Sequence, residues 1–236
     1  MGRHLVAACF CFAVLAGGAR ADALRIGTAG DYKPLTWYDA RTGTFSGTDI
    51  DLIRAFAADE GRAVVFVKTT WPQLMADLLA GRFDAAIGGI SRTPQRSREA
   101  LLSVTIARSG KVALVRCGDE ARYGSLAAID RTSVTVVENR GGTNEKFALG
   151  RIAHAVLVIV PDNRLPFVYL KEGRADVMFT DSIEAVYRQR TSDGALCAVH
   201  PDAPYTQDDK VAMFRKDQTA LRARFDAWFK KRRPEP

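Results

Sequence analysis

The stretch RAVVFVKTTWPQLMADLLAGRFDAAIGGIS, residues 62–91, decides the fold class. Residues 62–69 are rich in β-branched side chains, as in a buried strand. Residues 71–83 carry Pro72 in a first turn and Leu74, Leu78 and Leu79 at helical spacing, which predicts a helix. Residues 83–91 are again apolar and end in glycines. Strand, helix and strand in this order predict parallel strands with a helix packed on them.

The same alternation continues on both sides of this stretch. Further strands are predicted over residues 23–30, 111–117, 153–162 and 175–181. A helix with Asp49 as its N-cap and Ile50, Ile53 and Phe56 on one face precedes residue 62. Further helices follow the turn at 141–142 and span residues 165–173 and 219–233. We therefore predict an α/β protein of two lobes joined by two crossing strands. Residues 22–115 plus 199–236 form lobe 1, and residues 116–198 form lobe 2, inserted into lobe 1.

The first 21 residues have the pattern of a secretory signal peptide: the basic start MGRH, an apolar stretch and the small-x-small end ARA. Cleavage there would leave 215 of the 236 residues, enough for a hydrophobic core. No later stretch approaches a membrane span in length. The predicted location is the periplasm or the exterior of the cell.

Cleavage would also leave only Cys117 and Cys197. Two cysteines in an oxidising compartment predict one disulfide bond, with two separate buried thiols as the alternative.

The formal net charge of +7 falls to +5 once Arg3 and Arg20 leave with the signal peptide. The compartment, and the lack of interleaved aromatic and basic residues, argue against nucleic acid. The mild positive charge suits a small anionic substrate as partner. His154 and His200 lie in different segments, and we find no metal-ligand spacing or nucleotide-binding loop. We expect no metal and no cofactor; a homo-oligomer is compatible with the sequence.

Polar or glycine residues follow the predicted strands, in GDY, GGISRT, NRGGTNE and TDSIE. Ligands of open α/β sheets bind at the carboxyl ends of the strands. Two lobes that face each other would enclose a cleft lined by these loops.

The segments GDYKP (30–34), WPQLMADLLAGRFDAAIGGISRTPQR (71–96) and GRADVMFTD (173–181) resemble the family 3, polar amino-acid type, periplasmic solute-binding proteins. The segments TTWPQLM, NRGGTNEKFA, VPDN, TDSIEA and LCAVHP resemble one branch of that family, the periplasmic cyclohexadienyl dehydratases. The resemblance covers nearly the whole mature chain. It implies a type II two-lobe binding-protein fold, and an enzyme that converts prephenate to phenylpyruvate or arogenate to phenylalanine.

The resemblance places Arg96 on a ligand carboxylate, with Ser91 and the backbone at Gly89 as further donors. A guanidinium forms two parallel hydrogen bonds with a carboxylate. A solvated arginine in a charge-rich helix is the alternative.

Two carboxylates, Asp181 and Glu184, end the buried-type run VMFTDSIEA. By resemblance, Asp181 accepts the α-ammonium of an amino-acid ligand, and helix capping is its other role. Glu184 matches the general acid of the dehydratases. Such an acid must stay protonated near neutral pH, which burial and a second carboxylate favour. A surface glutamate in a first helical turn is the alternative.

The remaining candidates support these three. Asn139, Thr143 and Asn144 surround a glycine-rich turn that opens a helix, where backbone amides bind anions. By resemblance, Lys111 reaches into the cleft from a crossing strand, and Asp31, Tyr32 and Trp71 form a cleft wall that suits a ring. Ordinary turn, surface or core roles are the alternatives for each.

Three functions remain open at this point. The first is a dehydratase that uses Glu184, Lys111 and Asn144. The second is a binding protein that delivers an amino acid to an ABC transporter permease and performs no chemistry. The third is a secreted interaction protein that has lost its ligand.

Overall fold

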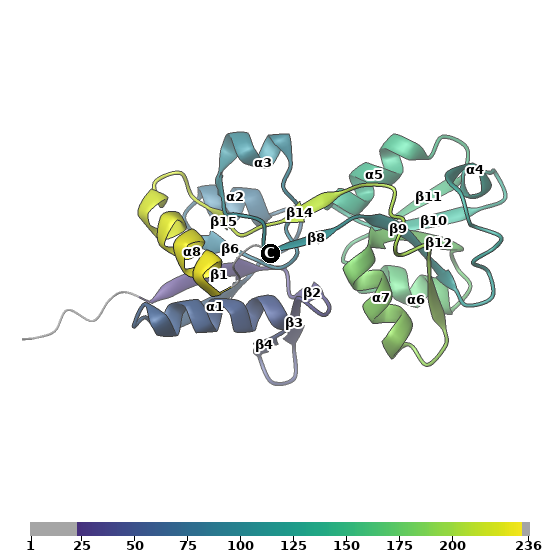
Figure 1. Cartoon of the computed structure of the whole chain (residues 1–236). Helices are drawn as coiled ribbons and strands as arrows, with labels where there is room; N and C mark the ends of the chain where they lie inside the picture. Colours follow the sequence, from purple (N-terminus) through teal and green to yellow (C-terminus); the bar gives the residue numbers. More distant parts are fainter. Residues whose placement is uncertain (1–22, 233–236) are drawn as a thin grey trace, which may run out of the picture.

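The computed structural model describes residues 23–232. Figure 1 shows two lobes side by side, with β8 and β14 running between them. The predicted signal peptide and the last four residues lie outside the described range.

The sheet of lobe 1 contains the strands that residues 62–91 predict. β1 (Leu24–Thr28) pairs in parallel with β5 (Val64–Lys68) on one side and with β6 (Ala85–Ala86) on the other. β15 (Met213–Phe214) pairs antiparallel with β6 and with β7 (Leu101–Leu102), which gives the order β5-β1-β6-β15-β7. The predicted parallel β-α-β unit is therefore confirmed.

Four helices belong to lobe 1: α1 (Thr48–Asp59), α2 (Leu74–Leu79), α3 (Pro94–Glu99) and α8 (Thr219–Arg232). Helices α1 and α8 pack on an apolar core in which Phe56 of α1 meets Phe225 of α8 with ring centroids 5.2 Å apart. Leu74 and Leu78 are buried as expected, but Leu79 is 56% exposed because α2 ends there, before the turn at Gly81. A small sheet of β2 (Asp31–Tyr32), β3 (Thr36–Asp39) and β4 (Thr44–Ser46) precedes α1.

The expected helix cap at Asp49 is wrong. Gly47 occupies the N-cap position of α1, and Asp49 lies in the first turn. The carboxylate of Asp49 accepts the backbone N–H of Gly89 at 3.0 Å, so it fixes the loop after β6.

The sheet of lobe 2 has the order β11-β10-β12-β9-β13. β10 (Thr135–Asn139) pairs in parallel with β11 (Val156–Val160) and β12 (Val177–Asp181). β9 (Lys111–Arg116) pairs antiparallel with β12 and with β13 (Leu196–Val199). The helices of this lobe are α4 (Leu126–Ile129), α5 (Thr143–Arg151), α6 (Leu165–Lys171) and α7 (Ser182–Thr191).

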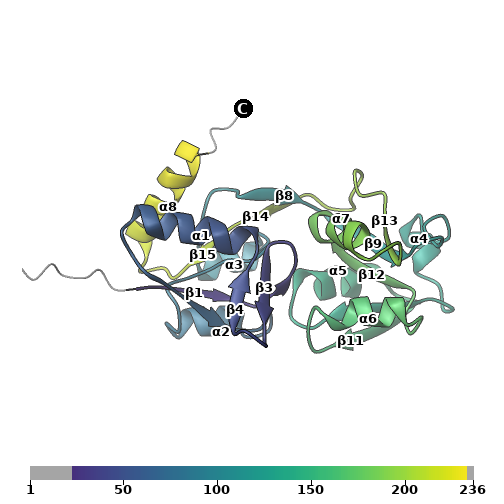
Figure 2. The same ribbon diagram turned by 90° about the horizontal axis from the view of Figure 1, so that it is seen from below.

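The crossing strands are β8 (Ala107–Ser109) and β14 (Asp208–Lys210), which pair antiparallel and run side by side between the lobes (Figure 2). Lys111 lies in β9, inside the second sheet, so its expected place in a crossing strand is wrong. Because β9 has a partner on each side, the sheets divide near residue 110 and not at residue 116.

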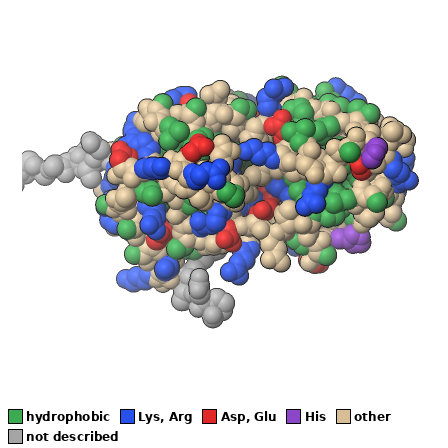
Figure 3. Space-filling view, turned by 90° about the horizontal axis from the view of Figure 1, so that it is seen from above, with side chains coloured by type: hydrophobic (Ala, Val, Ile, Leu, Met, Phe, Trp, Pro, Cys, Tyr) green, Lys and Arg blue, Asp and Glu red, His purple; other side chains and the backbone are tan. Residues whose placement is uncertain are grey.

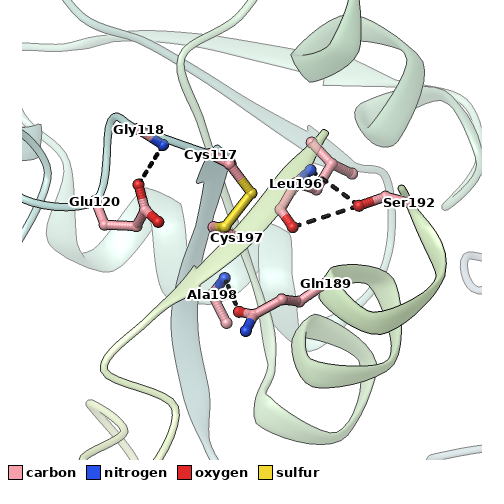
Figure 4. The surroundings of a disulfide bond; sticks show 8 residues. All are labelled: Cys117, Gly118, Glu120, Gln189, Ser192, Leu196, Cys197 and Ala198. Carbon is pink, nitrogen blue, oxygen red and sulfur yellow. Dashed lines mark hydrogen bonds between the residues drawn. A yellow bond between two sulfur atoms is a disulfide. The ribbon is translucent and has the colours of Figure 1, made fainter. Parts of the chain in front are cut away.

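The predicted disulfide between Cys117 and Cys197 is confirmed, with 4.8 Å between the Cα atoms (Figure 4). It joins the end of β9 to β13, and the backbone N–H of Ala198 donates to Gln189 of α7 at 2.8 Å beside it. Glu120 lies near the two sulfur atoms, but these are bonded to each other.

The surface of the molecule mixes charges of both signs. Figure 3 shows Lys and Arg side chains spread over both lobes of one face, with acidic side chains among them. Among residues 23–232, no helix has the length and apolar character needed to cross a bilayer.

Candidate functional site

A small cavity lies between the lobes. Lobe 1 contributes Tyr32, Trp71, Gly89 and Arg96 to its wall. Lobe 2 contributes Asn139, Gly142, Thr143, Asn144, Asn163 and Asp181. These residues lie at the carboxyl ends of β1, β5, β6, β10, β11 and β12 or in the segments that follow them. The cavity therefore lies between the lobes at the strand ends, where the sequence predicts a cleft.

The two lobes are closed onto each other. The Tyr32 hydroxyl of lobe 1 donates to Asp181 of lobe 2 at 2.6 Å. Gly141 lies so close to Pro72 across the cleft that a Cβ atom on the glycine would come within 2.6 Å of the proline nitrogen. The positive φ of Gly141, 84°, also favours glycine there.

Asp181 has three side-chain partners in the site. Its side chain receives the Tyr32 hydroxyl, Lys111 Nζ at 2.9 Å and Lys210 Nζ at 2.6 Å. Burial would raise the pKa of Asp181, but the two lysines overcome it and hold that pKa well below its usual range. Asp181 occupies the N-cap position of α7, yet its side chain does not cap the helix.

Lys210, at the end of β14, is a site residue that the sequence reasoning missed. It is 2% exposed and donates to Ser91 Oγ at 2.7 Å as well as to Asp181. Burial lowers its pKa, and Asp181 acts in the opposite direction. Ser91, predicted as a direct ligand donor, therefore stands behind the cavity wall as a partner of Lys210.

Arg96 projects from α3 into the cavity. Thr93 caps this helix by accepting the backbone N–H of Arg96, and Arg96 Nη1 donates to the carbonyl of Ser91 at 2.7 Å. Burial lowers the pKa of Arg96 to about 10, while Asp181 acts to raise it, so the guanidinium stays charged at neutral pH. Arg96 lines the cavity, and a guanidinium can form two parallel hydrogen bonds with a carboxylate.

The glycine-rich turn and the start of α5 form the opposite wall. Lys111 Nζ donates to Thr143 Oγ1 at 2.9 Å and also to Asn144 Oδ1. Asn144 in turn donates to Asn139 Oδ1 at 3.4 Å. The structure thus brings these four predicted residues together, with Lys111 one layer behind the other three.

Of the three residues predicted for a wall that suits a ring, Tyr32 and Trp71 line the cavity. Trp71 and Tyr32 meet edge to face with ring centroids 6.2 Å apart. Trp71 Nε1 donates to Asp31 Oδ1 at 3.0 Å, which fixes the indole and places Asp31 behind it. Gly89 is required beside them, because a Cβ atom there would lie 2.0 Å from the Tyr32 ring.

Glu184 is fully buried, 0% exposed, on the first turn of α7. Its carboxyl receives Thr180 Oγ1 at 2.9 Å, Arg188 at 3.1 Å and Asn163 Nδ2 at 3.0 Å. Burial raises its pKa to about 7, against the opposing effects of Arg188, Asn163 and Thr180. A carboxyl with this pKa is protonated in about half of the molecules at neutral pH.

Asn163 stands between Glu184 and the cavity, and the sequence reasoning did not single it out. It lines the cavity, is 1% exposed and also bonds Asp31 across the lobes at 3.3 Å. Its Oδ1 has no partner among residues 23–232. The only signal was its place in the segment VPDN.

Most of the predicted site residues reach the cavity. Eight of them line it: Tyr32, Trp71, Gly89, Arg96, Asn139, Thr143, Asn144 and Asp181. Four stand one layer behind, each bonded to a lining residue: Asp31, Ser91, Lys111 and Glu184.

Residues 24–235 match the family described as bacterial extracellular solute-binding proteins, family 3. The chain belongs to this family. Two relatives resemble this chain in sequence. Cyclohexadienyl dehydratase of Pseudomonas aeruginosa is 38% identical, over 96% of this chain and 88% of that protein. A probable amino-acid ABC transporter-binding protein of Haemophilus influenzae is 26% identical, over 86% and 76%.

Solved structures of solute-binding proteins share the two-lobe architecture. The ancestral amino acid-binding protein AncCDT-1, a precursor of cyclohexadienyl dehydratase, superposes with a TM-score of 0.81 at 30% identity, over 89% of this chain and 88% of that one. Holo ArgBP of T. maritima gives 0.80 at 23% identity, over 91% and 92%, and shows the fold alone. The predicted fold is confirmed.

Proposed function

We propose that this solute-binding protein is a periplasmic dehydratase that converts prephenate to phenylpyruvate, arogenate to phenylalanine, or both. Glu184 is the general acid, Arg96 holds one substrate carboxylate, and Lys111 with Asn144 supports the opposite wall. The observation that carries the proposal is the full burial of Glu184 beside the cleft, with a pKa raised to about 7.

The chemistry needs one proton and a dry site. The proton from Glu184 joins the ring hydroxyl, which leaves as water. The ring carboxylate leaves as carbon dioxide, and the electron pair of its bond to the ring completes the aromatic system. Glu184 then takes a proton back from solvent. General acid catalysis of this kind contributes about 10²–10⁴-fold to the rate.

Asn163 sets a condition on this proton transfer. Its amide separates Glu184 from the cavity in the closed form, at 3.0 Å from Glu184 Oε2. The proposal requires the amide to turn when the substrate enters, so that the carboxyl meets the leaving hydroxyl. The unpartnered Oδ1 of Asn163 is then available to the substrate.

The test is turnover of prephenate by the purified protein, followed as the enol absorbance of phenylpyruvate in alkali. We expect wild type and Glu172→Gln, which changes an exposed glutamate at the end of α6, to be active. Glu184→Gln should lose about 10²-fold or more while keeping its fold by circular dichroism.

Delivery of an amino acid to a transporter is the second candidate, because an amino-acid-binding protein is among the relatives. No turnover by wild type, together with a rise in melting temperature on addition of an amino acid, would establish this function in place of catalysis.

A further inference from the structure

Asp181 is not free to receive a cation from a ligand. It is 3% exposed, and Oδ2 already contacts Tyr32 Oη and Lys210 Nζ, both at 2.6 Å. Oδ1 contacts Lys111 Nζ at 2.9 Å. Both lysines are themselves 2% exposed, so water does not weaken these ion pairs.

The charges around the cavity leave a positive excess. Arg96 and Asp181 line the cavity, and Lys111 and Lys210 stand directly behind it, each in an ion pair with Asp181. Three further carboxyl groups, Asp31, Glu138 and Glu184, are buried behind the wall, and burial raises the pKa of each. A buried excess of positive charge is costly unless a ligand balances it. A ligand with two carboxylates supplies that balance.

A ligand ammonium group would find no free acceptor at Asp181. It carries three N–H donors and needs acceptors, but the oxygens of Asp181 already lie within 2.9 Å of two ammonium groups. A third cation beside them is repelled, and like-charge juxtaposition is a means of rejecting a ligand.

We infer that the cleft selects α-keto acids with a second carboxylate, or with an aromatic ring in its place, and rejects the α-amino acids of the same shape. Lys210 and Asp181 determine this choice. The inference rests on the proposed function in one respect: of the two dehydratase substrates, it assigns prephenate and disfavours arogenate.

Calorimetric titration with two matched pairs tests the inference. The first pair is phenylpyruvate and L-phenylalanine, titrated into wild type. The second pair is prephenate and arogenate, titrated into Glu184→Gln protein. The two members of each pair differ only at the keto or ammonium group. We expect wild type to bind phenylpyruvate at least about tenfold more tightly than L-phenylalanine. Glu184→Gln should likewise bind prephenate at least about tenfold more tightly than arogenate.

Lys210→Met removes one cation from Asp181 at nearly constant volume. It should shift the affinity ratio toward the amino acid by about tenfold or more. Lys146→Met is the matched control, because Lys146 is exposed at the cleft rim and bonds Gln95, not Asp181. It should leave the ratio unchanged.

The results separate this inference from the proposed function. Binding of keto acids without turnover would overturn the dehydratase and keep the inference. Amino acids that bind as tightly as keto acids, or no binding of either member of the pairs, would overturn the inference whatever the turnover. Those wild-type results decide the question even if Lys210→Met does not fold; an unchanged ratio in folded Lys210→Met would also overturn it.

Discussion

Glu184 couples the protonation state of one residue to the stability of the whole protein. Its pKa rises from 4.5 to about 7 on folding, so between these values the folded protein holds a proton that the unfolded chain has released. The stability that this proton confers is fully present below pH 4.5 and is lost as the pH rises through 7.

Glu184→Gln should remove this dependence, because glutamine has no proton to lose. Between pH 4.5 and 8, the free energy of unfolding of wild type should fall by about 3 kcal/mol relative to the variant. Urea titrations at several pH values measure the difference. If the difference does not change with pH, the carboxyl does not have the raised pKa.

Sequence reasoning found the residues whose chemistry is visible in short motifs, such as Arg96, Asp181 and Glu184, once a family resemblance was available. It missed Lys210, which looks like an ordinary lysine before an apolar strand. What makes Lys210 a site residue is its contact with Ser91, 119 positions away, and no local pattern encodes that contact. The two-lysine arrangement at Asp181 was hidden for the same reason.

At the scale of the element, the disulfide ties β9 to β13 across 80 residues of chain. Closing a loop of this length lowers the entropy of the unfolded chain. The double variant Cys117→Ser/Cys197→Ser should therefore lose about 2–4 kcal/mol of unfolding free energy. Urea unfolding without reductant measures this, and equal midpoints for the two proteins would refute it.

The alternation of strands and helices could be predicted from periodicity, but two features of the elements could not. The helix predicted over residues 71–83 shortens to α2, because residues before Leu74 and after Leu79 form turns. The place of β9 between β12 and β13 depends on antiparallel pairing with distant strands, which its own residues do not reveal.

At the scale of the molecule, closure depends on a few contacts between the lobes. Arg164, at the N-cap of α6, donates to the carbonyls of Gly30 at 3.1 Å and Tyr38 at 2.9 Å. Its guanidinium also lies 4.3 Å from the centroid of the Trp37 ring. These contacts join the hairpin of lobe 1 to lobe 2, while β8 and β14 connect the lobes at the hinge.

Arg164→Ala should shift the unliganded protein toward an open form, because it removes two hydrogen bonds that exist only on closure. Small-angle X-ray scattering should give a larger radius of gyration for the variant, and saturating phenylpyruvate should reduce it. Arg174→Ala is the control, since Arg174 stacks on Tyr169 within lobe 2. Identical scattering of Arg164→Ala and wild type would show that this contact does not hold the lobes.

The central claim is that a proton on Glu184 drives the loss of the ring hydroxyl. Its most direct test is the kcat for prephenate between pH 6 and 9, for wild type and Glu184→Gln. We predict that wild-type kcat declines as the pH rises through about 7, and that the variant is about 10²-fold slower or more without this decline. A wild-type rate that stays level across this range, or a variant as fast as wild type, would contradict the account.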